Sequence, residues 1–262
     1  MDLTMSPAET APTRALRTAD LEWALAEGWA DFKAKRGDLI LLPFLYPLAG
    51  VVAAVFAFNT NLLPLLFPLA AGFALVGPVA AAGFYELARR REAGIDAGWW
   101  HFLDPLRGRS RLPIAMLTVM LAAIFVAWMG VAQAVYGATL GTLSPQSPAD
   151  FVAGLFGTAQ GWTMIIVGNL IGALFAVITL ALSAFSFPMV VDKSSSGTID
   201  AVAAVATSVS AFQRSPAVMI GWGIRVAIIL FLAALPLFVG LMVALPVLGY
   251  ATWHLYTRAV AR

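Results

Sequence analysis

Long uncharged apolar segments constrain this chain more than any other feature of its sequence. The longest runs for about 39 residues, from 218 to 256, and Arg225 is its only charged residue. An α-helix crosses a bilayer with about 20 apolar residues. Charged residues make up only 11% of the 262 residues, against roughly 25% in soluble domains. The sequence therefore predicts an all-α, polytopic membrane protein.

Six transmembrane helices, paired as three hairpins, account for the apolar segments. Their expected bounds are Leu39–Phe58, Leu62–Tyr85, Pro113–Tyr136, Thr163–Phe187, Val218–Pro236 and Leu237–Tyr256. The last two divide the long run at a turn near Pro236 or Gly240, because one span needs only half of its length. A long, kinked or re-entrant helix is the alternative for this run.

The basic residues indicate which side of the membrane each loop faces. With six spans, both termini and the loops 86–112 and 188–217 share one side. That side carries every one of the sixteen Lys and Arg residues except Arg225, which lies within the fifth span. Cytoplasmic loops are enriched in Lys and Arg. We therefore expect a multi-pass protein of an inner (cytoplasmic) membrane with cytoplasmic N- and C-termini. The net charge of the whole chain is only +2, which gives no reason to expect nucleic acid as a partner.

An apolar pattern recurs before the first, third and fifth spans. The three copies are Leu25, Trp29 and Phe32; Ile95, Trp99 and Phe102; and Val205, Val209 and Phe212. Spacings of four and three residues put each trio on one helical face. We predict repeat units at about 18–85, 86–187 and 188–258 within one membrane domain (18–262), each an amphipathic interfacial helix followed by a hairpin. Residues 1–17 are expected to form a disordered tail.

The aromatic residues of these helices are expected at the depth of the lipid headgroups. The interfacial anchors that the sequence indicates are Trp29, Phe32, Trp99, Trp100, Phe102 and Trp253. Opposite the first trio, Glu22 and Asp31 fall on the polar face, and Thr198 is the expected N-cap of the third helix. The collar of helices either binds lipid or a partner, or only caps the bundle.

Two stretches carry a resemblance to a known family. They are GPVAAAGFYELARRREAG (77–94) and PVLGYATWHLYTR (246–258), accompanied by Gly28, Trp29 and Phe32 before the first span. Over about residues 20–258 the chain resembles an uncharacterised family of bacterial integral membrane proteins, a domain of unknown function. The resemblance implies a bacterial integral membrane protein and brings no activity, cofactor or catalytic residue. In architecture alone, the units also resemble the membrane domain attached to some glycerophosphodiester phosphodiesterases.

Four arginines are candidate contacts for lipid or another anion. Arg89, Arg90 and Arg91 follow the second span at the cytoplasmic interface, where a basic residue gains about 1 kcal/mol from anionic lipid. A specific ligand there is the alternative.

The fourth arginine, Arg225, lies ~10 Å inside the fifth span at 1.5 Å per residue. It either snorkels to the headgroups, pairs with Glu86 or Asp104, or binds an anionic ligand.

Catalytic patterns are missing from the sequence. His101 and His254 are the only histidines, and there is no cysteine. Two imidazoles can ligate haem or a metal if the fold brings them together, but the surroundings WWHFLDP and TWHLY are typical of an aromatic interfacial belt. No nucleophile elbow or phosphate loop occurs. We expect no catalytic, cofactor-binding or metal-binding residue, and hence no enzyme.

These features favour a non-enzymatic scaffold or accessory subunit of a larger membrane complex. The expected partners are the lipid bilayer, its anionic phospholipids and other membrane protein subunits. The alternative is a transporter, channel or lipid-handling protein with a cavity between the hairpins and Arg225 as an anion contact. An enzyme is the third possibility.

Overall fold

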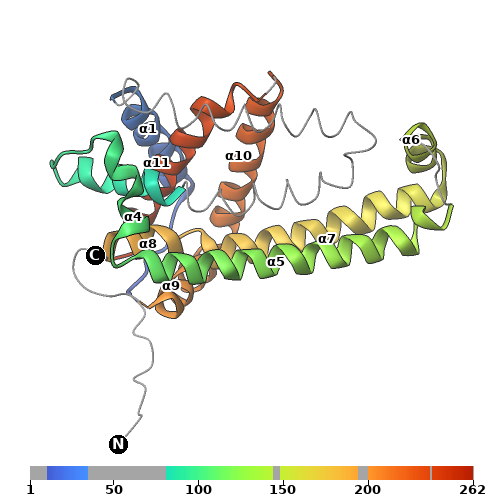
Figure 1. Cartoon of the computed structure of the whole chain (residues 1–262), viewed down its shortest axis with the longest axis horizontal. Helices are drawn as coiled ribbons and strands as arrows, with labels where there is room; N and C mark the ends of the chain where they lie inside the picture. The colour runs from blue at the N-terminus through green and yellow to red at the C-terminus, as the bar shows by residue number, and fades with distance from the viewer. Residues whose placement is uncertain (1–10, 35–80, 144–147, 194–199, 237, 262) are drawn as a thin grey trace, which may run out of the picture. The chain divides into compact units, whose positions relative to one another are not determined.

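The computed structural model describes residues 11–34, 81–143, 148–193, 200–236 and 238–261, and its regular elements there are helices (Figure 1). The first predicted span, Leu39–Phe58, lies outside the described residues, as does the second except for its last turn. The chain divides into two compact units. One comprises Met120–Thr179, and the other comprises Met1–Val119 with Leu180–Arg262. Neither boundary coincides with those of the predicted repeats.

The smaller unit is built from a helical hairpin. Helix α5 (Arg111–Ala138) contains the third predicted span, and α7 (Ala159–Ser183) covers the fourth except for its last four residues. Both are long and apolar enough to cross a membrane. They run side by side (Figure 1), with the rings of Trp128 and Phe175 5.6 Å apart. A Cβ on Gly172 would lie 3.3 Å from the Trp128 ring. This glycine therefore lets the bulky indole pack between the two helices.

Two short helices connect α5 to α7. They are η3 (Leu140–Leu143) and α6 (Pro148–Gly157). Asp150 lies in the first turn of α6, where an acidic side chain is favoured by the helix dipole. Thr158 then fixes the turn into α7, because its hydroxyl accepts a hydrogen bond from the Gly161 amide at 3.0 Å.

Helix α11 (Leu241–Ala259) forms the core of the larger unit, where Tyr250, Trp253 and Tyr256 are fully buried. Helix α1 (Thr18–Ala34) packs against it (Figure 1). A Cβ on Gly28 would lie 2.6 Å from the Val247 carbonyl oxygen, so the two backbones approach closely at this point. Only glycine permits that approach without movement of the backbone.

The long apolar run of the sequence folds as two helices. Helix α10 (Pro216–Ala234) corresponds to the fifth predicted span and is long and apolar enough to cross a membrane. The turn between α10 and α11 lies where it was predicted, around Pro236 and Gly240. Proline favours the end of a helix, because it has no amide hydrogen and restricts the residue before it. The sequence predicts the sixth span at α11. Among the described helices, however, α11 is not one of those apolar enough to cross a membrane.

The N-terminal segment is paired with the end of the chain. The Arg14 amide donates to the Ala259 carbonyl at 2.7 Å, and the Ala261 amide donates to the Pro12 carbonyl at 2.9 Å. Residues 11–17 therefore have fixed partners, although the sequence predicts disorder for the whole of 1–17. Backbone hydrogen bonds hold this segment, and its polar composition does not reveal them.

The first and third predicted amphipathic helices are present. Helix α1 carries the first trio, and α9 (Ala201–Arg214) carries the third. Both helices bury one face, which in α9 consists of small side chains, and leave their trios partly exposed. The predicted N-cap of α9 was Thr198, which lies outside the described residues. Instead α9 begins at Ala201, and the Asp200 side chain accepts from the Val202 amide at 3.2 Å.

The second predicted amphipathic helix, through Ile95, Trp99 and Phe102, is wrong. A helix covers residues 81–92 and ends at Gly94, whose φ is +67°. Glycine adopts this left-handed conformation without strain and so commonly ends a helix. Residues 95–98 are not helical, and the chain continues in the 3₁₀-helix η2 (Trp99–Leu103) and the short α4 (Asp104–Arg107).

Candidate functional site

The three consecutive arginines lie at the end of the helix of residues 81–92, which is anchored in the core of the larger unit. A Cβ on Gly83 would lie 2.5 Å from the Phe102 ring, and Phe84 packs edge-on against Phe102 at 5.1 Å. Because successive residues on a helix point about 100° apart, Arg91 reaches a different carboxylate from the one that Arg89 and Arg90 share. Together with the groups they contact, the three arginines form two groups of ion pairs, joined through the helix that carries them, which we call the arginine network. Its members are Asp31, Glu86, Arg89, Arg90, Arg91, Asp96, His101, Asp104 and His254.

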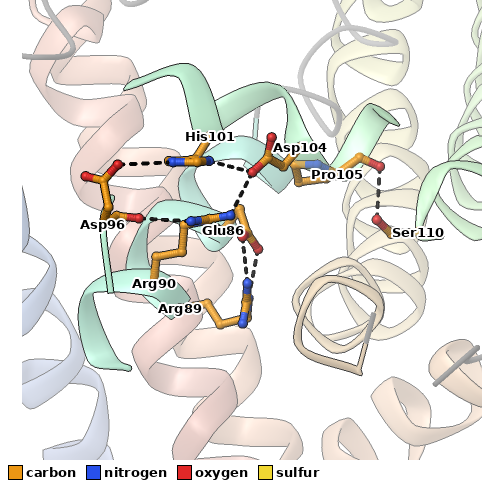
Figure 2. Close-up of polar contacts among 8 residues, drawn as sticks. All are labelled: Glu86, Arg89, Arg90, Asp96, His101, Asp104, Pro105 and Ser110. Atoms are coloured by element: carbon orange, nitrogen blue, oxygen red, sulfur yellow. Dashed lines mark hydrogen bonds and ion pairs between the residues drawn. The ribbon is translucent and has the colours of Figure 1, made fainter. Parts of the chain in front are cut away.

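Glu86 is the buried acceptor of this network, with only 4% of its surface exposed. Arg89 binds it with two hydrogen bonds, from Nε at 2.8 Å and from Nη2 at 2.7 Å, and Arg90 adds a third from Nε at 2.7 Å (Figure 2). Such charge-assisted pairs are short and strong. The hydrogen bond to Glu86 raises the pKa of Arg89, and partial burial opposes this rise. Both guanidinium groups are therefore held against a carboxylate that has little contact with water.

Arg90 extends the network into the following segment. Its Nη2 donates to Asp104 at 2.9 Å, and its Nη1 donates to the Asp96 carbonyl at 3.0 Å (Figure 2). His101 lies between the same two aspartates, with Nδ1 2.7 Å from Asp104 and Nε2 3.2 Å from the Asp96 carboxylate. Arg90 and His101 thus fix the non-helical residues 93–98 against the helix that precedes them.

Asp31 connects three distant parts of the chain. Its carboxylate forms an ion pair with Nη1 of Arg91 at 2.6 Å and lies 2.9 Å from Nε2 of His254. It is only 6% exposed, whereas the sequence assigned it to the polar face of an interfacial helix. A buried carboxylate requires paired and hydrogen-bonded partners, and Arg91 and His254 provide them. Helix α1, the helix of residues 81–92 and α11 are consequently joined at one carboxylate.

The two histidines belong to different parts of the arginine network. His101 contacts Asp96 and Asp104, whereas His254 contacts Asp31. Among the residues that the structure describes, no group of three His, Cys, Asp or Glu side chains is arranged to hold a metal ion.

Two of the predicted interfacial anchors are core residues. Trp253 is fully buried, and its indole N–H donates to Glu92 at 3.1 Å, while Phe102 is buried against Phe84. The prediction that Trp253 and Phe102 lie at the membrane interface is therefore wrong. Both side chains face the interior of the larger unit. Trp29, Trp99 and Trp100 are exposed, and Phe32 stacks on Trp29 at 5.6 Å.

Arg225 does not form either of the ion pairs considered for it among the described residues. Its Nη1 donates to the Gly221 carbonyl at 3.3 Å, within the same helix. Glu86 and Asp104 instead bind Arg89 and Arg90.

The acidic members of the network were not predicted as site residues. A local signal for Glu86 was present, since carboxylates three or four residues before an arginine pair with it on a helix. Asp31 gave no such signal, because its partners are distant in sequence. Each of Arg89, Arg90 and Arg91, predicted as lipid contacts, has a carboxylate partner within the chain.

The fold and this site define a helical integral membrane protein whose polar residues join its helices. Residues 66–192 match the model of a family described as "Predicted integral membrane protein (DUF2189)". The match confirms the resemblance to an uncharacterised family of integral membrane proteins. It includes the stretch 77–94, with all three consecutive arginines, but does not reach 246–258. No curated protein and no solved structure was found to match the chain.

Proposed function

We propose that this integral membrane protein is a non-enzymatic scaffold or accessory subunit of a larger assembly in a bacterial inner membrane. The observation that carries the proposal is the mutual pairing of Asp31, Arg91 and His254. These side chains have the chemistry of a polar site, yet they bind one another across three segments. Removing one partner of a buried pair typically costs about 3–5 kcal/mol, so this arrangement favours a rigid framework.

The contacts of the larger unit support the proposed orientation. The paired N-terminal and C-terminal segments lie together, as an even number of spans requires. Arg91 of the loop 86–112 contacts α1, and Asp192 accepts from Tyr256 of α11 at 2.9 Å. Segments assigned to the basic, cytoplasmic side are therefore neighbours. We place both termini in the cytoplasm on this basis, together with the distribution of basic residues.

A stripe of large apolar side chains on α7 is suited to contact another subunit. Every fourth residue along one side of this helix is exposed: Trp162, Ile166, Leu170, Leu174 and Ile178. Residues spaced by four lie on one helical face. In a bilayer either lipid or a neighbouring helix covers such a stripe, and membrane helices associate through close packing of their side chains.

Photo-crosslinking in intact cells tests this proposal. A photoreactive amino acid at Leu170 or Leu174 should capture the same protein that co-purifies with the chain in mild detergent. At Phe175, which faces Trp128 within the hairpin, the same label should give no intermolecular product. Replacing Leu170 and Leu174 together by alanine should reduce the yield of the co-purifying protein.

Purification of the chain only as a monomer or homo-oligomer, with lipid as the only crosslinked species at the stripe, would contradict the proposal. If the monomer alone then moved a solute across liposomes, the transporter, channel or lipid-handling alternative would replace it.

A further inference from the structure

The chain segment between the helix of residues 81–92 and α5 carries exposed side chains that do not take part in the arginine network. Trp99 and Trp100 stack there with their ring centroids 3.5 Å apart, and Trp100 is 66% exposed. Neither indole lies in the core, unlike the neighbouring Phe102. Tryptophan combines a large apolar ring with a polar N–H and is enriched at membrane–water interfaces. An exposed stacked pair therefore has the chemistry of an interfacial contact.

Three arginines follow this pair and differ from the consecutive arginines in their surroundings. Arg107, Arg109 and Arg111 are exposed, and within the described ranges none has a carboxylate or other side-chain partner. By contrast, Arg89 and Arg90 share Glu86. Positive charge available for an external anion thus lies at residues 107–111. This position follows the three consecutive arginines that the sequence indicates as contacts for lipid or another anion.

A fixed turn presents these arginines. The Ser110 hydroxyl is buried and donates to the Pro105 carbonyl at 3.0 Å (Figure 2), while the Gly108 amide donates to the Asp104 carbonyl at 3.0 Å. Asp104 also binds Arg90, so the turn is attached to the arginine network. The backbone that carries the arginines is held in place, even though their side chains have no side-chain partner among the residues that the structure describes.

The position of this surface in the chain identifies its partner. Helix α5 begins at Arg111, is long and apolar enough to cross a membrane, and exposes Leu112 in its first turn. The bilayer surface must therefore lie near the start of α5. Guanidinium groups bind phosphate oxygens with paired hydrogen bonds. We propose that Trp99, Trp100, Arg107, Arg109 and Arg111 bind the anionic phospholipid headgroups of the cytoplasmic leaflet.

Lipid selectivity of the purified chain tests the proposal. The protein is reconstituted in phosphatidylcholine nanodiscs containing spin-labelled phosphatidylglycerol or spin-labelled phosphatidylcholine, and the motionally restricted fraction of each label is measured. The wild type should prefer phosphatidylglycerol. The triple variant R107Q/R109Q/R111Q should lose this preference by about fivefold or more, the loss expected when basic residues near an anionic leaflet are neutralised.

The matched control is R14Q/R17Q/R214Q, which removes three other exposed arginines and lowers the net charge of +2 by the same amount. It should retain most of the preference. Absence of a preference in the wild type, or an equal loss in both variants, would overturn the proposal and leave an acidic partner protein as the occupant to consider.

A second measurement does not depend on substituting the arginines. The chain contains no cysteine, so Trp100→Cys accepts a single spin label. We expect its accessibility to oxygen and to a water-soluble nickel chelate to indicate headgroup depth. Accessibility equal to that of a fully hydrated label would overturn the placement of this surface at the membrane, whatever the lipid preference.

Discussion

His254 and Asp31 lie 2.9 Å apart although 223 residues separate them in the chain. Since Arg91 binds the other oxygen of the same carboxylate, Asp31 is the point at which the beginning, the middle and the end of the sequence meet. The stability of the larger unit should therefore depend strongly on this one side chain.

We expect Asp31→Asn to destabilise the protein by about 3 kcal/mol, the lower end for a broken buried pair, because Arg91 retains some contact with water. Unfolding in mixed detergent micelles, followed by tryptophan fluorescence, measures the change. Glu22→Gln, on an exposed position of the same helix, is the control and should stay within about 0.5 kcal/mol of the wild type. Equal stability of the two variants would show that the Asp31 contacts contribute little.

The pairing of Glu86 with Arg89 should appear as a coupling energy. Glu86→Gln leaves two partly buried guanidinium groups without their shared carboxylate, whereas the double variant E86Q/R89Q leaves only one. The double variant should therefore be less destabilised than the sum of the single variants, by at least about 0.5 kcal/mol. Additive losses would contradict a direct interaction.

The pH dependence of the Arg89 contribution has a definite sign. Pairing raises the pKa of Arg89 above its ordinary value, so the stabilisation is fully present below that ordinary value and is lost only as the pH rises through the folded-state pKa. Unfolding measured between about pH 6 and pH 9 should show the same Arg89→Gln penalty throughout, because arginine stays protonated in this range. A penalty that disappeared within the range would assign the effect to another group.

Glycine 28 should be far less tolerant of a methyl group than other helical glycines. Gly28→Ala places Cβ 2.6 Å from the Val247 carbonyl oxygen, and such overpacking typically costs about 1–3 kcal/mol. Gly130→Ala in α5, where no neighbour lies within 4 Å, should be neutral or stabilising by up to about 1 kcal/mol. Thermal unfolding of both variants in the same detergent provides the comparison, and equal shifts would exclude close packing at Gly28.

The proposed orientation can be tested by labelling introduced cysteines, since the chain has none of its own. Ala19→Cys in α1 should react with a membrane-impermeant maleimide only after the cells are opened. Ala149→Cys in α6 should react in intact cells. Both positions are exposed, so access to the reagent decides the outcome, and the reverse pattern would invert the topology.

Apolar segment lengths predicted the helices around 113–136, 163–187 and 218–236 well, because an uncharged run near 20 residues long has few folds open to it. The prediction of a second amphipathic helix through Ile95, Trp99 and Phe102 was wrong. The spacing of apolar residues does not show that the preceding helix ends at Gly94, directly before Ile95. Burial of Trp253 and Asp31 was also missed. An aromatic or acidic residue near a predicted interface has the same local sequence whether it faces lipid or another helix.

Only part of the arginine network could be predicted from the sequence. Glu86, Arg89 and Arg90 lie within one turn of each other, so their pairing follows from helical geometry. Arg91 lies five residues after Glu86, outside the spacing at which side chains pair on a helix, and it pairs instead with Asp31 of α1. The difference between paired and free arginines, on which the lipid proposal rests, required the tertiary contacts.

The docking of α1 on α11 sets an order for biosynthesis. The chain is made from its N-terminus, so Gly28 and Asp31 emerge well before α11, which provides the surface that receives them. Until α11 is complete, α1 has neither the packing partner of Gly28 nor the histidine partner of Asp31. The larger unit can therefore close only after α11 has been synthesised, and a chain truncated before residue 241 would display an unoccupied helix face and an incompletely paired carboxylate to the machinery that removes unfinished proteins.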